Sequence, residues 1–175
     1  MLAKYQILVI PGGFSYGDDV AAGRIFANQL RHHLADAMRE FRDAGKLILG
    51  ICNGFQVLLK TGLLLTEDGR GPRTTLTWND SGKYEDRWVH LAATNDDCVF
   101  FSGVERLELP IAHAEGKFVA RDERALKHLD TTGQLVLRYT DSAGEIALDY
   151  PANPNGAQAG VAGVCDESGR VLGLM

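Results

Sequence analysis

The sequence lacks the features that mark secreted, membrane-spanning and metal-binding proteins. Its 175 residues hold only three cysteines, Cys52, Cys98 and Cys165, which are odd in number and have no Cys-x-x-Cys spacing. Such a set favours a reducing cytoplasm over a disulfide framework. The longest apolar runs have the length of a strand, far short of the ~20 residues of a membrane span. The amino-terminal residues also lack the order of a signal peptide.

An excess of positive charge is also missing. The 18 basic and 23 acidic residues give a net charge of −5, and no basic block stands out. The charge of the chain therefore does not indicate that it binds nucleic acid. Apolar residues make up 45 % of the chain, enough for a core, and we expect residues 1–175 to form a single domain.

The amino-terminal third alternates between strand and helix patterns. The apolar runs at residues 6–10 and 46–50 have the character of buried strands. Apolar side chains recur every three or four residues from 20 to 41, which predicts one helix, and a second helix ends at Gly62. The order strand, helix, strand, helix predicts an α/β fold with an open, mostly parallel sheet and helices on both faces.

The remaining sequence favours strands and turns. Residues 87–91 and 107–111 are typical of strands, with Trp88 expected in the core, and residues 122–129 of a short helix. Two hairpins are expected from four further runs: residues 134–139 with 145–149, and residues 161–165 with 170–175.

The most informative segment surrounds Cys52, between a predicted strand and a predicted helix. Gly50 and Gly54 flank it at two residues on each side, the layout of a nucleophile elbow. This turn presents the side chain at the carboxyl edge of the sheet, where the N-terminus of the next helix favours a thiolate and a nearby oxyanion. An isolated cysteine is more often a core residue, and we interpret Cys98 and Cys165 that way.

A second glycine-rich turn, Pro11-Gly12-Gly13, follows the first predicted strand. If the two strands are neighbours, both turns face one crevice. Backbone N–H groups of Gly13 and Asn53 would then bind the oxyanion formed when Cys52 attacks a carbonyl. An ordinary strand-to-helix turn is the alternative for this segment taken alone.

Together these segments resemble class I glutamine amidotransferases, and most closely the glutaminase component of phosphoribosylformylglycinamidine synthase. The family implies a flavodoxin-like α/β fold. The resemblance covers the whole chain, in the family's order. It rests on five blocks: PGGFSYGD at residues 11–18, GICNGFQ at 50–56, TWNDSG at 77–82, PIAHAEG at 110–116 and YPANPNG at 150–156.

The resemblance implies a reaction and a set of partners. Cys52 would attack the side-chain amide of glutamine, release ammonia and leave a glutamyl thioester that water hydrolyses. Gly12, Phe14 and Gln56 would hold the glutamine. Ammonia would pass to a synthetase subunit for the ATP-dependent amidation of formylglycinamide ribonucleotide in purine biosynthesis, with a small accessory subunit as a further partner. ATP and Mg²⁺ belong on the synthetase, so neither cofactor nor metal is expected here, and no nucleic acid or membrane.

The sequence departs from the family pattern at its ends. Family members have an initial strand-helix-strand unit. They also have a His-x-Glu pair, which directly follows a strand that resembles residues 170–175. Both are missing here, so we expect an incomplete domain. His113 and Glu115 have the same spacing and would point to one face of an extended segment. The family carries this segment as well as the true pair. We therefore interpret both as residues that line the site or an interface, with a substitute base and a solvated loop as alternatives.

Two other functions stay open. The chain is either catalytically inactive, binding at most a partner or a carboxylate ligand, or the elbow serves another cysteine hydrolase of the same fold. Asp18 and Asp19 are two carboxylates without further ligands, which is weak evidence for a metal. We expect Asp18 to order the loop before the first helix.

Overall fold

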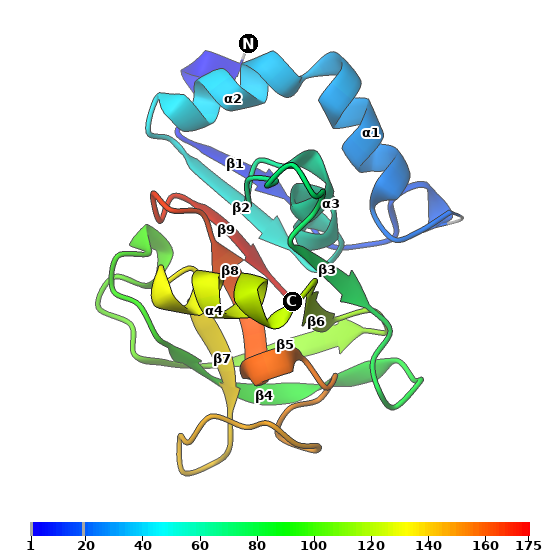
Figure 1. Ribbon diagram of the computed structural model, residues 1–175, viewed down its shortest axis with the longest axis vertical. Coiled ribbons are helices and arrows are strands. Elements are labelled where there is room, and N and C mark those ends of the chain that lie inside the picture. Colours follow the sequence, from blue (N-terminus) through cyan, green and yellow to red (C-terminus); the bar gives the residue numbers. More distant parts are fainter. Residues whose placement is uncertain (1, 19) are drawn as a thin grey trace.

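The computed structural model describes residues 2–18 and 20–175, which form a seven-stranded sheet, a two-stranded sheet and four α-helices (Figure 1). The helices are α1 (Arg24–His33), α2 (Ala35–Asp43), α3 (Asn53–Thr61) and α4 (Glu123–Thr131). The strands are β1 (Ile7–Ile10), β2 (Leu47–Ile51), β3 (Thr74–Thr77), β4 (Glu85–Ala93), β5 (Arg106–His113), β6 (Lys117–Ala120), β7 (Leu137–Thr140), β8 (Val161–Cys165) and β9 (Val171–Leu174).

The large sheet has the strand order β1-β2-β9-β8-β7-β4-β5. Strands β1, β2 and β9 run parallel, and every later neighbour pair is antiparallel. The predicted α/β class is confirmed, but the parallel part is limited to three strands. The turn at residues 166–170 joins β8 to β9 without a crossover helix, and only antiparallel neighbours allow so short a connection.

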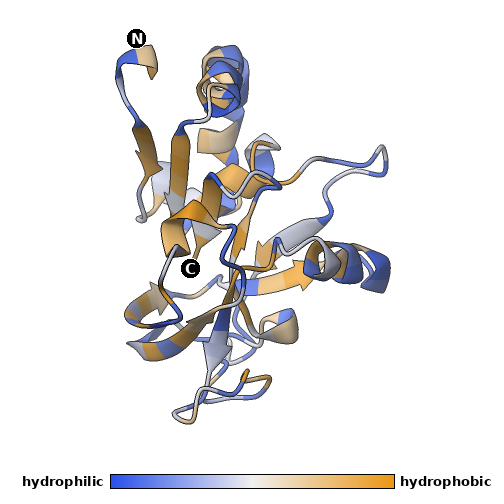
Figure 2. Ribbon diagram, turned by 90° about the vertical axis from the view of Figure 1, so that its left-hand side faces the viewer, coloured by the Kyte–Doolittle hydropathy of each residue, from blue (hydrophilic) through white to orange (hydrophobic). Residues whose placement is uncertain are grey.

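The helices that pack on the parallel strands lie to one side of them, whereas the sequence predicted helices on both faces (Figure 2). Helix α3 covers the face of Ile48 and Gly50, since a Cβ added at Gly50 would meet the Leu58 side chain at 2.6 Å. On the opposite face Ile7 and Val9 stay 53 % and 47 % exposed. The continuous apolar run of β1 is therefore packed against other residues on one face only, and the prediction that both of its faces are buried was wrong.

Several element boundaries also differ from the prediction. The expected single helix at residues 20–41 is two helices, because the backbone of Leu34 leaves the helical region (φ −130°, ψ 6°). The expected strand at residues 145–149 does not form, and one isolated bridge joins Thr140 to Ile146. Trp88, expected in the core, is exposed. The hairpin of β8 and β9 and the helix beginning after its cap Asp122 are confirmed.

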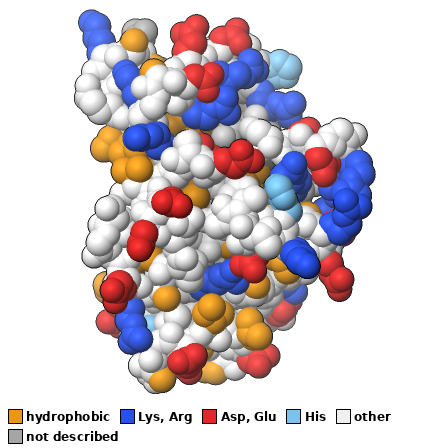
Figure 3. All heavy atoms as spheres, turned by 60° about the vertical axis from the view of Figure 1, so that its left-hand side comes forward, with side chains coloured by type: hydrophobic (Ala, Val, Ile, Leu, Met, Phe, Trp, Pro, Cys, Tyr) orange, Lys and Arg blue, Asp and Glu red, His pale blue; other side chains and the backbone are white. Residues whose placement is uncertain are grey.

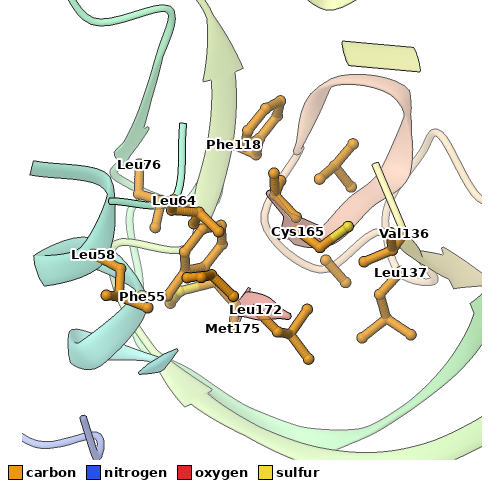
Figure 4. Close-up of a cluster of buried hydrophobic side chains, with 14 of the residues drawn as sticks. Phe55, Leu58, Leu64, Leu76, Phe118, Val136, Leu137, Cys165, Leu172 and Met175 are labelled. Atoms are coloured by element: carbon orange, nitrogen blue, oxygen red, sulfur yellow. The ribbon is translucent and has the colours of Figure 1, made fainter. Parts of the chain in front are cut away.

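The core fixes α3 against the end of β9. The Phe55 ring lies where a side chain on Gly173 would sit, so glycine is needed at that position. Figure 4 shows Phe55 grouped with Leu64, Leu172 and Met175. This packing holds the start of α3, and therefore Cys52, at the carboxyl ends of β2 and β9. In the part of the chain that the structure describes, no helix has the length and apolar character to cross a membrane.

Candidate active site

Cys52 occupies a sharp turn between β2 and α3, as the glycine spacing predicted. Its backbone has φ 51° and ψ −109°, a conformation that residues other than glycine rarely adopt. The Cys52 N–H donates to the Leu174 carbonyl at 2.8 Å, which ties the turn to the end of β9. The thiol donates to the Ala112 carbonyl of β5 at 3.9 Å. The large sheet therefore curls until its last strand faces the thiol.

The Gly12-Gly13 turn lies beside Cys52, because β1 and β2 are parallel neighbours. A Cβ added at Gly12 would lie 3.4 Å from the Cys52 Cβ, and Gly13 has a φ of 126°. The Asn53 side chain joins the two turns: its Oδ1 accepts from the Ser15 N–H and its Nδ2 donates to Asp18, both at 3.3 Å. The expected juxtaposition of the two glycine turns is confirmed. The oxyanion role of Gly13 and Asn53 stays a prediction.

A cavity of about 840 Å³ opens over the thiol. Its walls come from the Gly12-Gly13 turn, the elbow, β5 and the turn at residues 113–116, and the end of β9. Every predicted site residue except the buried Asn53 lines it: Gly12, Gly13, Phe14, Cys52, Gln56, His113 and Glu115. Sequence reasoning missed the contribution of Tyr84 and of the end of β9, because that contribution depends on how the sheet curls.

Gln56 connects the elbow to the turn at residues 113–116. Its Nε2 donates to the Glu115 carbonyl at 2.9 Å, and its Oε1 accepts from the Asn53 Nδ2 at 3.0 Å. Asn79 holds the same turn from the other side, since its Nδ2 donates to the His113 carbonyl at 2.8 Å and its Oδ1 accepts from the Gly116 N–H at 3.1 Å. Two buried amides thus set the shape of one cavity wall. Asn79 was visible in the sequence only as part of the TWNDSG block.

The electrostatics of the elbow differ from the expected thiolate. Burial raises the pKa of the Cys52 thiol above its ordinary value, and the Asp18 carboxylate adds to this shift. The Asn53 N–H at the start of α3 acts in the opposite direction but does not outweigh burial. The resting side chain is therefore a neutral thiol at pH 7, and it needs a base before it can attack.

His113 is a poor candidate for that base. Its side chain is 3 % exposed, and neither ring nitrogen has a hydrogen-bond partner among the described residues. Burial lowers its pKa to about 4. The pKa of His113 is lowered and that of the Cys52 thiol is raised, so transfer of the proton from the thiol to this imidazole is unfavourable. We therefore read His113 as a residue that lines the site.

The low pKa of His113 predicts a specific dependence of stability on pH. The unfolded imidazole titrates near 6.5 and the folded one near 4, so below pH 6.5 the unfolded state binds the extra proton. Stability should fall as the pH drops from 6.5 towards 4, by about 3 kcal/mol in total from this residue. Urea unfolding of the wild type and of His113→Asn at several pH values would measure it. Equal pH slopes for the two proteins would contradict the expectation.

The sequence raised Asp18 and Asp19 as weak candidates for a metal site. No group of three or more His, Cys, Asp or Glu side chains in residues 2–18 and 20–175 is arranged to hold a metal ion. Asp18 orders the loop before α1, as expected, because its Oδ1 accepts from the Gly23 N–H at 3.3 Å. Asp19 lies outside the described residues.

The comparisons with known proteins agree with this geometry. A family model for the CobB/CobQ-like glutamine amidotransferase domain matches residues 1–175. The chain is 48 % identical to the phosphoribosylformylglycinamidine synthase subunit PurQ of Methanococcus maripaludis (strain C7), over 99 % of this chain and 65 % of that protein. The PurQ subunit of Dehalococcoides mccartyi is 47 % identical, over 99 % of this chain and 67 % of that protein.

Solved structures give the same result. The structure of PurLQS from Thermotoga maritima matches with a TM-score of 0.70 and 35 % identity, over 98 % of this chain and 68 % of that one. A Thermotoga maritima glutamine amidotransferase with 17 % identity and a TM-score of 0.54, over 99 % of this chain and 56 % of that one, supports the fold alone. The chain spans 65 % of the length of the Methanococcus relatives. It therefore belongs to the CobB/CobQ-like glutamine amidotransferase family, and within it to the PurQ subunits.

Proposed function

We propose that this protein is the glutaminase subunit of a phosphoribosylformylglycinamidine synthase. The observation that carries the proposal is the Cys52 elbow, which opens into the cavity beside the Gly12-Gly13 turn. A thiol alone in such a cavity fits several reactions. The membership of the chain in the PurQ family supports glutamine as the substrate.

The proposed reaction has two steps. In the first, the Cys52 sulfur attacks the side-chain carbonyl carbon of glutamine, the C–N bond breaks, and the thiol proton leaves with the nitrogen as ammonia. In the second, water attacks the thioester, which frees glutamate and restores the thiol. The N–H groups of Gly13 and Asn53 would stabilise the oxyanion of both tetrahedral intermediates, a contribution worth ~3–4 kcal/mol for one donor in other enzymes. Gly12, Phe14 and Gln56 would hold the substrate.

The geometry of β9 supports one position for a base. Leu174 is bonded to the backbone of Cys52, and Met175 lines the cavity. A residue attached to the carboxyl side of Met175 would therefore begin beside the cavity. We infer that the His-x-Glu pair implied by the family acts from this position, since His113 is too weak a base.

The ammonia is proposed to go to a synthetase subunit that carries the ATP and Mg²⁺. Aromatic side chains are enriched at protein interfaces, and Trp78 and Tyr84 are exposed at the cavity while Trp88 is exposed on β4. Their position supports a synthetase docked over the cavity, and an accessory subunit is proposed as a further partner. The three free cysteines suit the reducing cytoplasm as the site of the reaction.

A non-catalytic role is the second candidate, favoured by the raised pKa of Cys52 and the low pKa of His113. One experiment separates the two. Protein extended after Met175 by Pro-His-Pro-Glu, which supplies the His-x-Glu pair of the family, is incubated with glutamine and hydroxylamine. Hydroxylamine intercepts a thioester as γ-glutamyl hydroxamate. We expect ammonia to equal the sum of hydroxamate and glutamate, and a rate lower by ~10²–10⁴-fold when that histidine is alanine.

The same assay contains its own controls. A simple ester offered in place of glutamine should react far more slowly, because the cavity would hold the amino acid part of glutamine. Faster turnover of the ester would favour another cysteine hydrolase. Folded protein that binds glutamine and yields no hydroxamate would establish the non-catalytic role.

A further inference from the structure

A second pocket, separate from the Cys52 cavity, lies between the loop at residues 66–73 and helix α4. It has a volume of about 200 Å³ and shares no lining residue with the active-site cavity. Figure 3 shows basic side chains gathered beside a histidine and several acidic groups at the right of its view. The charged or titratable residues that line the pocket are Asp68, Arg70, Arg73, Arg121, Arg124 and His128.

The carboxylate that lines this pocket, Asp68, and the neighbouring Asp122 are already paired with arginines. Asp68 accepts a bidentate pair of bonds from Arg121, at 2.9 and 2.6 Å, and this pairing holds the pKa of Asp68 well below its usual range. Arg70 lies 3.5 Å from Asp68 and 3.5 Å from Asp122. Each carboxylate therefore has a guanidinium partner without Arg73 or Arg124.

Arg73 and Arg124 are the surplus cations. The nearest carboxylate oxygen to Arg73 belongs to Asp68, at 3.9 Å, and the buried Arg73 Nε has no hydrogen-bond acceptor. Arg124 has no ion pair within 4 Å in the described part of the chain. A buried donor without an acceptor costs ~1–3 kcal/mol, and uncompensated like charges repel. An added anion would remove both costs.

The backbone places these residues around the pocket before any ligand binds. Arg73 directly precedes β3 and Arg121 directly follows β6, the two strands of the small sheet. The Arg121 N–H donates to the Arg73 carbonyl at 2.8 Å, which extends the pairing of the strands. Arg124 and His128 lie one turn apart on α4. Because the backbone is already arranged, binding an anion would have to order only the side chains.

We propose that this pocket binds a small phosphate-bearing anion through Arg73 and Arg124. The planar guanidinium group forms paired hydrogen bonds that match the oxygens of a phosphate. Apart from His128, the pocket has no ring that could stack on a nucleobase, and its volume suits the phosphate group of a small monoester. The site is independent of the proposed glutaminase reaction.

Titration with inorganic phosphate at constant ionic strength, followed by calorimetry, tests the proposal. We expect saturable binding of one phosphate per chain, weakened at least ~10-fold in Arg124→Gln and in Arg73→Gln, because each loses a charge-assisted pair of bonds. Arg73→Lys keeps the positive charge but cannot form the paired hydrogen bonds of a guanidinium group, so this variant should bind phosphate with intermediate affinity. Arg39→Gln is the matched control, since Arg39 is an exposed arginine on α2 that pairs with Asp36.

Folding and binding are separated by the choice of variants. Arg124 is exposed and forms no ion pair in the described residues, so Arg124→Gln should melt within a few degrees of the wild type. Equal phosphate affinity in the wild type and in folded Arg124→Gln would overturn the proposal. So would the absence of saturable binding to the wild type, or a loss of affinity in Arg39→Gln as large as in Arg124→Gln.

Discussion

Replacing Cys52 with alanine is expected to reduce kcat/KM for glutamine hydrolysis by ~10⁴-fold or more, in protein that carries the His-x-Glu pair. The sulfur is the atom that bonds to the substrate carbon, and no neighbouring group can take its place. Glutamine binding should survive, because Gly12, Phe14 and Gln56 remain. Ammonia release under saturating glutamine measures the rate, and calorimetry measures the binding.

Cys98→Ala serves as the control for this variant. Cys98 is fully buried and lies outside the cavity, so its replacement affects stability and should leave kcat/KM within a few-fold of the wild type. Glutaminase activity retained in Cys52→Ala, or lost in folded Cys98→Ala, would contradict the assignment of the nucleophile.

Replacing Gly54 with alanine is expected to have the largest effect on folding. A Cβ at this position would overlap the Ile10 carbonyl oxygen, a backbone atom of β1 that cannot rotate away. Since α3 and β1 would have to separate, we expect a loss of more than ~4 kcal/mol, a large fraction of the ~5–15 kcal/mol that stabilises a typical domain. Urea unfolding followed by circular dichroism measures this loss.

Gly45→Ala distinguishes this overlap from ordinary backbone strain. Gly45 follows α2 and has a φ of 73°, but a Cβ there meets no atom within 4 Å. Its replacement should cost only about 1 kcal/mol. Similar losses in the two variants would show that the close approach of α3 and β1 is not what requires Gly54.

The elbow could be predicted from the sequence because its determinants are local. Three patterns fall within about fifteen residues: a strand pattern, two glycines spaced around a cysteine, and a helix pattern. Each one indicates its own local structure. The neighbouring Gly12-Gly13 turn followed from the rule that consecutive parallel strands pair. These two segments supply the thiol and one side of the cavity.

The opposite wall could not be predicted in the same way. Strand β5 lies far from β2 in the sheet, and the two meet only because the sheet curls. The pairing of β3 with β6 joins segments about forty residues apart, without a local turn signal. The role of Asn79 depends on that long-range packing, since it bonds the turn at residues 113–116.

The expected thiolate illustrates how a local effect, the start of a helix, competes with burial, which the tertiary fold determines. The start of α3 does favour charge on Cys52, through the Asn53 N–H. Burial of the sulfur beneath β5 acts more strongly in the opposite direction, and it is set by the tertiary fold. The position of the nucleophile was therefore predictable, whereas its protonation state required the structure.

Labelling with a diazo-ketone analogue of glutamine tests the central claim most directly. The protein is incubated with one equivalent of the analogue, digested, and mapped by mass spectrometry. The structure predicts one label per chain, on Cys52, and protection by excess glutamine. Labelling of Cys98 or Cys165, or equal labelling with and without glutamine, would contradict the presence of a glutamine-binding nucleophile at the elbow.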